Sequence, residues 1–318
     1  MNNILEVKDL YVSNNEVNIL KGISLQVQSG EILGIVGESG CGKSTLLRTI
    51  MAMNGETEKI NNGDVLFKGK SLKEMKPKEM LNLRGSELGV VFQNPISTLN
   101  PVRKIGPQFV ETMKSHRKIS RKDALDEAAE MLSRVNLKDP HCILNSYPFE
   151  LSGGMNQRVA LALSMILKPS LLLADEPTSA LDVTVQKQVI KELLHLREQY
   201  NMAMVLVTHS MGVISNMADK VAVLYGGTLV EYGEKETILQ KPVHPYTRSL
   251  IRAVPKLGGT MVRGIKGFPP EFGKVSEGCI FAPRCGRVKE RCRKSIPALK
   301  NTSYGTMAAC FYSVEGEC

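Results

Sequence analysis

The chain has 318 residues, of which 42% are hydrophobic and 23% are charged, the balance of a soluble globular protein. Its length suits one large domain or two ordinary ones. The formal net charge is +9, which alone does not select between nucleic acid, an anionic membrane surface and phosphate ligands. Aromatic residues make up only 5% and Trp is absent, which argues against a protein that stacks single-stranded bases.

Targeting signals are not apparent in the sequence. No segment approaches the roughly 18 uninterrupted apolar residues of a membrane-spanning helix. The first residues, MNNILEVKDLYV, lack the basic segment, apolar block and cleavage site of a signal peptide. We therefore expect a cytosolic setting, in which disulfide bonds are disfavoured and clustered cysteines indicate a metal site.

Short apolar runs predict strands along the first 240 residues. Residues 4–12 and 22–28 alternate apolar and polar side chains, as half-buried strands do. Residues 30–37 form a denser apolar run, typical of a strand buried on both faces, and a helical pattern follows from Ser44. Three further runs are expected to be strands, at 89–95, 170–177 and 202–210.

Amphipathic helical patterns lie between these strands, notably at 121–137 and 182–200. Strands that alternate with helices indicate an α/β fold with a mainly parallel sheet. The stretch from about 95 to 168 is rich in helical patterns and is expected to be an inserted helical subdomain. No internal repeat is evident, so the chain carries one such unit rather than a tandem pair.

The sequence changes in character after residue 233. Residues 220–233 are expected to form a hairpin around Gly226 and Gly227. Segments punctuated by Pro and Gly follow, and four cysteines come after them. We place a domain boundary near residue 240, between a main domain (1–240) and a C-terminal extension (241–318).

A phosphate-binding motif follows the densest apolar run. The string GESGCGKS (37–44) fits G-x-x-x-x-G-K-[ST], after a strand and at the start of a helix. Its glycines allow close backbone approach, and the N–H groups with the helix N-terminus form an anion cradle. Lys43 is expected to reach the β- and γ-phosphates and Ser44 to bind Mg²⁺, while Cys41 points away. The expected nucleotide-binding residues are Gly37, Glu38, Ser39, Gly40, Cys41, Gly42, Lys43, Ser44 and Thr45.

Two carboxylates follow another apolar strand, in LLLADE (171–176). Asp175 is delivered to the carboxyl edge of the sheet, where it can hold Mg²⁺. Glu176 then stands beside the γ-phosphate and can polarise the attacking water. Taken alone, Asp175 and Glu176 could simply be two solvent-exposed carboxylates at the end of a strand. The phosphate motif elsewhere in the chain favours a catalytic role for them instead.

Five ordered motifs resemble those of the ATP-binding-cassette (ABC) ATPases. LSGGMNQR (151–158) is similar to the family signature, and Gln93, SALD (179–182) and His209 stand at the places of the other markers. The resemblance implies a head-to-tail dimer with two ATP molecules at its interface. It implies that the catalytic residues are Glu176, His209, Lys43 and Gln93. It implies Mg²⁺ binding by Ser44, Gln93 and Asp175, and capping of the opposite subunit's nucleotide by Ser152, Gly153, Gly154 and Gln157.

One position departs from the family pattern. ABC cassettes usually carry an aromatic residue near the end of the first strand, which stacks on adenine. The matching position here is Asn14, with Tyr11 three residues earlier as the alternative. The resemblance therefore leaves open which side chain meets the base.

Three longer strings resemble ATPases of peptide and nickel importers. They are NPISTLNPVRKIGPQ (94–108), DEPTSALDVTVQ (175–186) and HPYTRSLIRAVP (244–255), the last followed by GCIFAPRC in the C-terminal extension. The resemblance implies an ATP-hydrolysing subunit that energises uptake of dipeptides or oligopeptides. A nickel or metal-chelate importer of the same subfamily is the alternative.

The resemblance also implies partners. These are a second ATPase subunit, usually a different chain, two transmembrane permease subunits and an extracytoplasmic substrate-binding protein. The segment from Gln93 to about Gln108 would contact the permease, with the chain peripheral on the cytoplasmic face of the membrane. A soluble ABC ATPase acting on nucleic acid is disfavoured, because such members carry two cassettes or large insertions. A regulatory ATP sensor is disfavoured by the intact Glu176 and His209.

Four cysteines are clustered in the extension: Cys279, Cys285, Cys292 and Cys310. The first three are separated by five and six residues, wider than most zinc-binding pairs, whereas the larger body of an iron–sulfur cluster tolerates other spacings. Spacing alone leaves zinc, a cluster and inert cysteines open. The resemblance favours a [4Fe–4S] cluster, because some peptide-importer ATPases carry this pattern. Nearby basic residues would partly offset the thiolate charge: Arg284, Arg287, Lys289, Arg291, Arg293 and Lys294.

Overall fold

Two compact units make up the chain, residues 1–73 with 207–318 and residues 74–206. The computed structural model describes residues 3–94, 98–179, 182–254, 264–273 and 277–313. Within these ranges no helix has both the length and the apolar character needed to cross a membrane.

A four-stranded antiparallel sheet opens the first unit, in the order β2-β1-β4-β5. Its strands are β1 (Asn3–Asn14), β2 (Val17–Gln28), β4 (Glu58–Phe67) and β5 (Lys70–Ser71). β1 and β2 confirm the expected strands at 4–12 and 22–28. β4 was not predicted, because its first half, EKINN, is mostly polar and largely solvent-accessible. It forms a strand by pairing with β1.

Five further strands of the first unit are ordered β11-β12-β10-β9-β3. They are β3 (Ile32–Val36), β9 (Lys220–Tyr225), β10 (Thr228–Glu234), β11 (Lys300–Asn301) and β12 (Met307–Ala308). β3 is buried along its whole length and runs parallel to β9, as its continuous apolar run predicts. The predicted hairpin is confirmed, with Gly226 at φ 53° and Gly227 at φ 81°, angles that favour glycine.

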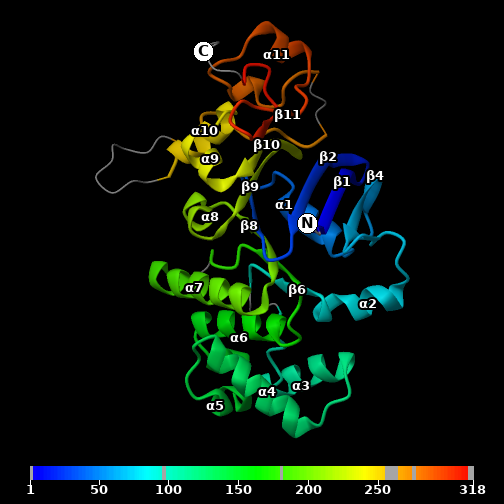
Figure 1. Ribbon diagram of the computed structural model, residues 1–318, viewed down its shortest axis with the longest axis vertical. Coiled ribbons are helices and arrows are strands. Elements are labelled where there is room, and N and C mark those ends of the chain that lie inside the picture. Colours follow the sequence, from blue (N-terminus) through cyan, green and yellow to red (C-terminus); the bar gives the residue numbers. More distant parts are fainter. Residues whose placement is uncertain (1–2, 95–97, 180–181, 255–263, 274–276, 314–318) are drawn as a thin grey trace. The chain divides into compact units, whose positions relative to one another are not determined.

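The C-terminal residues pack on this sheet rather than standing apart from it. β12 pairs with β10, so the orange-to-red part of the chain lies against the sheet edge (Figure 1). The fully buried carboxylate of Glu231, on β10, accepts hydrogen bonds from the backbone of Val243 and His244. The remaining elements are α1 (Lys43–Ile50), α8 (Met211–Met217), α9 (Lys235–Gln240), α10 (Pro245–Arg252), α11 (Glu290–Lys294) and a 3₁₀ turn, Ala282–Arg284.

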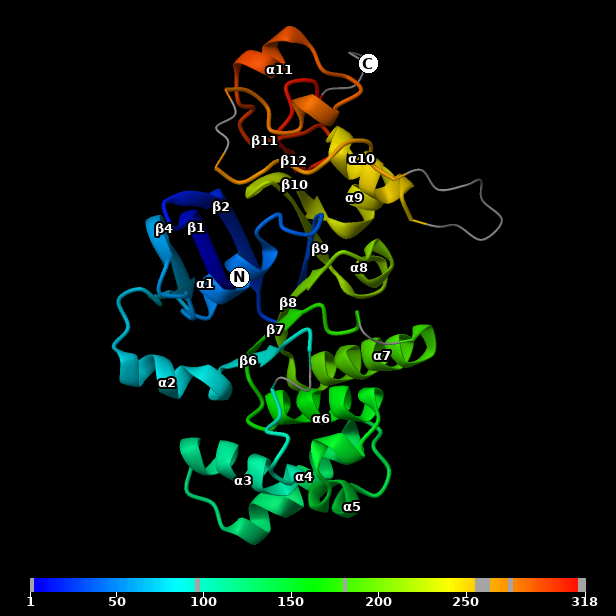
Figure 2. The same ribbon diagram turned by 180° about the vertical axis from the view of Figure 1, so that it is seen from behind.

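Helices dominate the second unit. They are α2 (Pro77–Ser86), α3 (Ile105–His116), α4 (Arg121–Arg134), α5 (Pro140–Asn145), α6 (Gly153–Met165) and α7 (Val183–Tyr200), with a 3₁₀ turn at Pro148–Glu150. Both views place α6 between α7 and the group formed by α3, α4 and α5 (Figures 1 and 2). The helices expected at 121–137 and 182–200 are thereby confirmed as α4 and α7, and the stretch from about 95 to 168 is rich in helices as expected.

The strands of the second unit are ordered β8-β7-β6. They are β6 (Leu88–Val91), β7 (Leu171–Asp175) and β8 (Ala203–Thr208), the last of which continues past residue 206 into the first unit. β6 and β7 run parallel. The strands expected at 170–177 and 202–210 are confirmed, whereas the one expected at 89–95 ends already at Val91. The fold class predicted from the sequence is correct: an α/β core with parallel strands, an antiparallel sheet, a helical part and a cysteine-containing C-terminal module.

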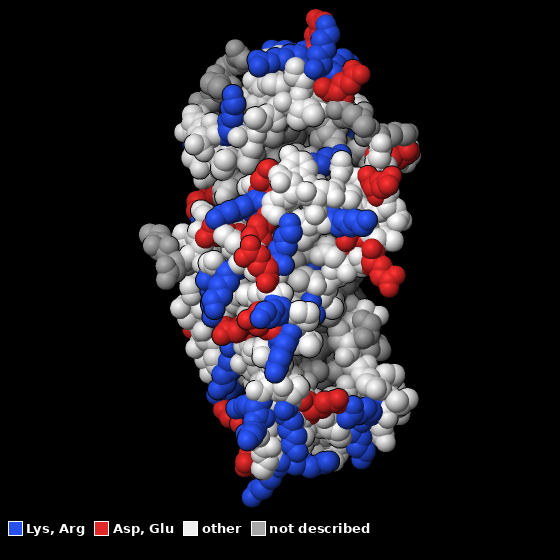
Figure 3. Space-filling model, turned by 90° about the vertical axis from the view of Figure 1, so that its right-hand side faces the viewer, with Lys and Arg blue, Asp and Glu red and all other residues white. Residues whose placement is uncertain are grey.

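Surface charge is mixed on the face drawn in Figure 3. Lys and Arg side chains alternate with Asp and Glu over much of it, despite the formal net charge of +9. Basic side chains predominate at the lower end of this view, and the two signs are mixed over its middle.

The core of the helical group allows a matched test of packing. Phe109 on α3 is fully buried, whereas Phe149 is 72% exposed. Phe109→Ala should lower the free energy of unfolding by about 3–5 kcal/mol, because it removes a buried ring and leaves a cavity. Phe149→Ala should cost no more than about 1.5 kcal/mol, the value of its stacking on Tyr147. Urea denaturation followed by circular dichroism measures both, and equal losses would contradict this assignment of the core.

Candidate nucleotide site and cysteine cluster

The phosphate motif forms a tight loop between β3 and α1. Gly37 has no room for a side chain, because a Cβ there would lie 2.2 Å from the carbonyl oxygen of Leu224. Gly40 and Gly42 have φ angles of 76° and 103°, in the left-handed region. Gly37 therefore allows the close backbone approach that the motif predicts, and Gly40 and Gly42 adopt the backbone angles that favour glycine.

Lys43 folds back over the loop. Its ammonium donates hydrogen bonds to the carbonyl oxygens of Gly37, at 2.8 Å, and Glu38, at 3.0 Å. α1 begins at Lys43 with no side-chain cap and no acidic residue in its first turn. The helix N-terminus is thus left for an anion.

Exposure differs along the loop. Ser39, Gly40 and Ser44 are exposed, so the concave side of the loop is open to a ligand. Cys41 is buried, and burial raises the pKa of its thiol. Its position agrees with a structural residue rather than a redox switch. Thr45 is also buried, and its hydroxyl accepts a hydrogen bond from Arg48.

The second unit holds the predicted carboxylates and Gln93. Asp175 is the last residue of β7, and Glu176 follows it in the left-handed region at φ 46°. Such angles are strained for a residue with a side chain and persist where surrounding structure enforces them, often at functional sites. The amide of Gln93, after β6, donates a hydrogen bond to the carboxylate of Glu176 at 3.2 Å. The structure therefore brings Gln93 and Glu176 together.

The signature motif begins α6. Ser152 is the N-cap residue, and its hydroxyl accepts a hydrogen bond from the backbone of Met155. Ser152 and Gly153 are exposed, and a Cβ on Gly153 would meet no atom within 4 Å. Gln157 differs, since it is buried and its amide donates to the carbonyl oxygen of Pro177 at 2.7 Å. The start of this helix is open to an anion, while Gln157 faces inward and braces the residue after Glu176.

His209 follows β8 directly, in the first unit. Its side chain is exposed at the carboxyl end of a buried strand, as the sequence predicts. Residues 180–181 of the SALD motif and 95–97 of the predicted permease-contacting segment lie outside the described residues.

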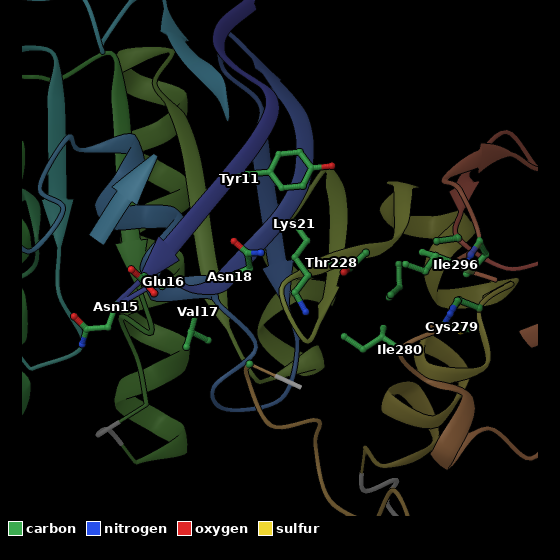
Figure 4. Close-up of a pocket in the computed structure, with 16 residues that line it drawn as sticks. Tyr11, Asn15, Glu16, Val17, Asn18, Lys21, Thr228, Cys279, Ile280 and Ile296 are labelled. Carbon is green, nitrogen blue, oxygen red and sulfur yellow. The ribbon is translucent and has the colours of Figure 1, made fainter. Parts of the chain in front are cut away.

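A cavity of about 660 Å³ lies between β2 and the C-terminal residues of the first unit (Figure 4). Tyr11 lines it together with Asn15 and Lys21 on one side and Cys279 and Ile280 on the other. Asn14 does not line it, and its buried amide oxygen has no hydrogen-bond partner among the described residues. Of the two positions considered for the base, Tyr11 is the one that lines this cavity.

The four cysteines of the extension line one small cavity. They come from separate segments, with Cys292 on α11 and the backbone N–H of Cys279 bonded to the carbonyl oxygen of Cys292 at 2.7 Å. All six cysteines within the described ranges are free thiols, and Cys318 lies outside those ranges. Burial raises the pKa of Cys279 to about 11, and it also raises the pKa values of Cys285 and Cys310.

The spacing of these thiols does not match a single metal ion. Among the described residues, no group of three or more His, Cys, Asp or Glu side chains is arranged to hold one ion. The cysteines nevertheless share a cavity, and a four-iron cluster binds thiolates through four different metal atoms. The four cysteines therefore share one cavity, and the described residues show no metal site there.

The neighbouring basic residues do not act as one group. Lys289 lies over the ring of Tyr312, and Arg291 lies over that of Phe311. Arg284 instead forms an ion pair with Glu38 of the phosphate loop. The prediction that all six basic residues offset the cysteine charge is therefore wrong for Arg284. No local pattern could reveal its contact, because the partners are 246 residues apart in the chain.

Comparison with protein families gives two matches along the chain. Residues 20–179 match the model described as ABC transporter, and residues 230–292 match the oligopeptide/dipeptide transporter C-terminal region. The oligopeptide transport ATP-binding protein OppD of Salmonella typhimurium is 38% identical, over 99% of this chain and 95% of its own length. The probable peptide ABC transporter ATP-binding protein y4tR of Sinorhizobium fredii is 40% identical, over 98% and 96%.

Solved structures give the same fold. A dimeric ATP-binding cassette in a post-hydrolysis state with ADP and phosphate is 26% identical, with a TM-score of 0.65 over 73% of this chain and 98% of that one. The cbiO1 protein of Clostridium perfringens, part of an ABC transporter complex, is 27% identical, with a TM-score of 0.66 over 76% and 93%.

Proposed function

We infer the role of the chain from its family: it belongs to the ABC transporter ATPases and carries their oligopeptide/dipeptide transporter C-terminal region. We propose that it binds and hydrolyses ATP to energise uptake of dipeptides or oligopeptides. The similarity over nearly the whole chain to proteins named for oligopeptide and dipeptide transport carries this proposal. A nickel or metal-chelate importer of the same subfamily is the alternative.

ATP binding is assigned to the phosphate loop and its flanks. The loop 37–45 offers backbone N–H groups at an uncapped helix start, and Lys43 already lies over it. When a nucleotide arrives, the ammonium exchanges two carbonyl partners for phosphate oxygens, which are stronger acceptors because they are charged. Ser44 and Asp175, with Gln93, provide the oxygen ligands that Mg²⁺ prefers, and the ion would supply charge neutralisation at the phosphates.

Hydrolysis is assigned to Glu176 as the general base. Its carboxylate orients a water molecule and takes its proton as the water oxygen attacks the γ-phosphorus and the bond to the β-phosphate oxygen breaks. Gln93 fixes the carboxylate through the 3.2 Å hydrogen bond. Lys43 and His209 stabilise the charge that develops on the phosphoryl oxygens.

A second ATPase subunit is proposed to complete each site. Ser152, Gly153 and Gly154 stand at the exposed start of α6, where N–H groups and the helix dipole suit a γ-phosphate of the facing subunit. ATP then favours the closed pair and loss of the γ-phosphate releases it. Gln157 contributes from within its own subunit, by holding Pro177.

Transport requires membrane partners, and we propose two permease subunits and an extracytoplasmic substrate-binding protein. The chain is then peripheral, on the cytoplasmic face of the membrane. The segment from Gln93 to Gln108 is assigned to the permease contact, supported by Val102, whose apolar side chain is 78% exposed. We also propose the division into an ATPase domain to residue 240 and an extension beyond it.

The extension is proposed to bind a [4Fe–4S] cluster through Cys279, Cys285, Cys292 and Cys310. The shared cavity of the four thiols and the resemblance to peptide-importer ATPases motivate this proposal. Bound there, the cluster would cross-link segments that have little regular secondary structure, so we assign it a structural role.

Glu176→Gln should lower the turnover number at least about 100-fold while the affinity for ATP stays within about threefold, because only the general base is lost. Phosphate release and equilibrium ATP binding measure the two effects. Glu198→Gln changes an exposed carboxylate of α7 and should alter neither. Normal hydrolysis in Glu176→Gln would reject the assignment of the base.

Anaerobic purification should give a brown protein that absorbs near ~400 nm, as iron–sulfur clusters do. Iron and sulfide analysis should give equal amounts of the two elements. Cys292→Ser should lose the colour, whereas Cys142→Ser, an exposed cysteine on α5, should keep it. A colourless sample that contains zinc would contradict the cluster.

Val102→Glu should reduce co-purification with the permease, because it puts a charge where an apolar side chain meets the partner. Phe268→Glu makes the same kind of change at a ring that is 92% exposed in the extension, and it should have little effect. Equal recovery of permease with Val102→Glu and with the unmodified chain would exclude this contact.

A further inference from the structure

The C-terminal extension reaches the phosphate loop itself. The guanidinium of Arg284 donates two hydrogen bonds to the carboxylate of Glu38, at 2.5 and 2.9 Å, one to each oxygen. Glu38 is the second residue of the phosphate motif, and Arg284 belongs to the 3₁₀ turn between Cys279 and Cys285. Both residues lie within the first unit.

The geometry of this pair favours a fixed position over a loose surface contact. The side chain of Arg284 is only 4% exposed and that of Glu38 is 24% exposed. Arg284 also donates to the carbonyl oxygens of Lys266 and Ile265 and to the hydroxyl of Tyr225. These contacts fix the guanidinium so that its in-plane N–H edge meets the carboxylate in one orientation.

The backbone of Glu38 is held at the same time. Its N–H donates to the hydroxyl of Tyr246, on α10 of the extension, at 2.8 Å, and its carbonyl oxygen accepts from Lys43. Tyr246 is fully buried and packs against Tyr225 and Phe281, with ring centroids 4.5 and 5.4 Å away. Phe281 immediately precedes the turn that carries Arg284, so one aromatic cluster supports both contacts.

We propose that Arg284 is a positioning residue for ATP binding: it acts through Glu38 to hold the phosphate loop in the shape that accepts the phosphates. Without this pair, the first turn of the loop must be ordered when the nucleotide binds, and that ordering weakens the affinity. The groups that carry out hydrolysis are not part of the pair. Its loss therefore affects ATP affinity more than turnover.

The test compares Arg284→Gln, Glu38→Gln and the double variant in the full-length protein, by equilibrium MgATP binding and steady-state ATPase. Each single variant should weaken ATP binding at least about tenfold, and Arg284→Gln, which lies outside the loop, should keep the turnover number at saturating ATP within about threefold. The double variant should bind no more weakly than the worse single variant, because the two residues act as one contact. Arg284→Lys should give an intermediate affinity, since it keeps the charge but lacks the two-pronged geometry.

Arg293→Gln, on α11, is the matched control and should bind ATP as the unmodified chain does. ATP affinity within twofold of normal in Arg284→Gln, or additive losses in the double variant, would overturn the inference. If Arg284→Gln does not fold, the more exposed Glu38→Gln and the conservative Arg284→Lys decide by the same criteria. The inference rests on the proposed ATP site: an unmodified chain that binds no ATP would refute that site, whereas normal binding in all variants refutes only the role of Arg284.

Discussion

The first unit depends on one packing constraint: the phosphate loop packs directly against the end of β9. Gly37 lies so close to the carbonyl oxygen of Leu224 that even a methyl group would overlap it. The carbonyl oxygen of Cys41 accepts a hydrogen bond from Gly227, in the hairpin after β9. The loop thus contacts the same strand and hairpin against which the C-terminal residues pack.

These contacts explain why the residues beyond 240 fold together with the phosphate loop in the first unit. Glu231 anchors the start of α10 to β10, and Tyr246 on that helix reaches the loop. Tyr225, at the end of β9, contacts the rings of both Tyr246 and Phe281, which also contact each other. These aromatic rings pack together, and the hydroxyls of Tyr246 and Tyr225 hydrogen-bond to Glu38 and Arg284, so the sheet, the extension and the loop are connected through them.

The sequence was sufficient to predict features that depend on local pattern. The phosphate loop was predictable because phosphate binding requires its glycines, Lys43 and Ser44 to be close together in the sequence. The hairpin at Gly226 and Gly227 was predictable because two adjacent left-handed residues favour glycine. Repeated apolar runs likewise revealed the buried strands and the amphipathic helices.

Features that depend on distant partners were not predictable. β4 has a polar first half and becomes a strand only beside β1. Gln157 stands in the signature string, yet its amide is buried against Pro177. Arg284 was predicted to balance the cysteines and instead pairs with Glu38, a contact across 246 residues that no local rule anticipates.

The four cysteines and the phosphate loop therefore lie within the first unit, linked by a short turn. The turn that carries Arg284 is bounded by Cys279 and Cys285, so whatever orders these thiols also orders the residue that holds the loop. Amide hydrogen exchange of the full chain, with and without MgATP, tests the central claim most directly. The account predicts that ATP slows exchange at residues 37–45. Exchange at 37–45 that ATP leaves unchanged would contradict it.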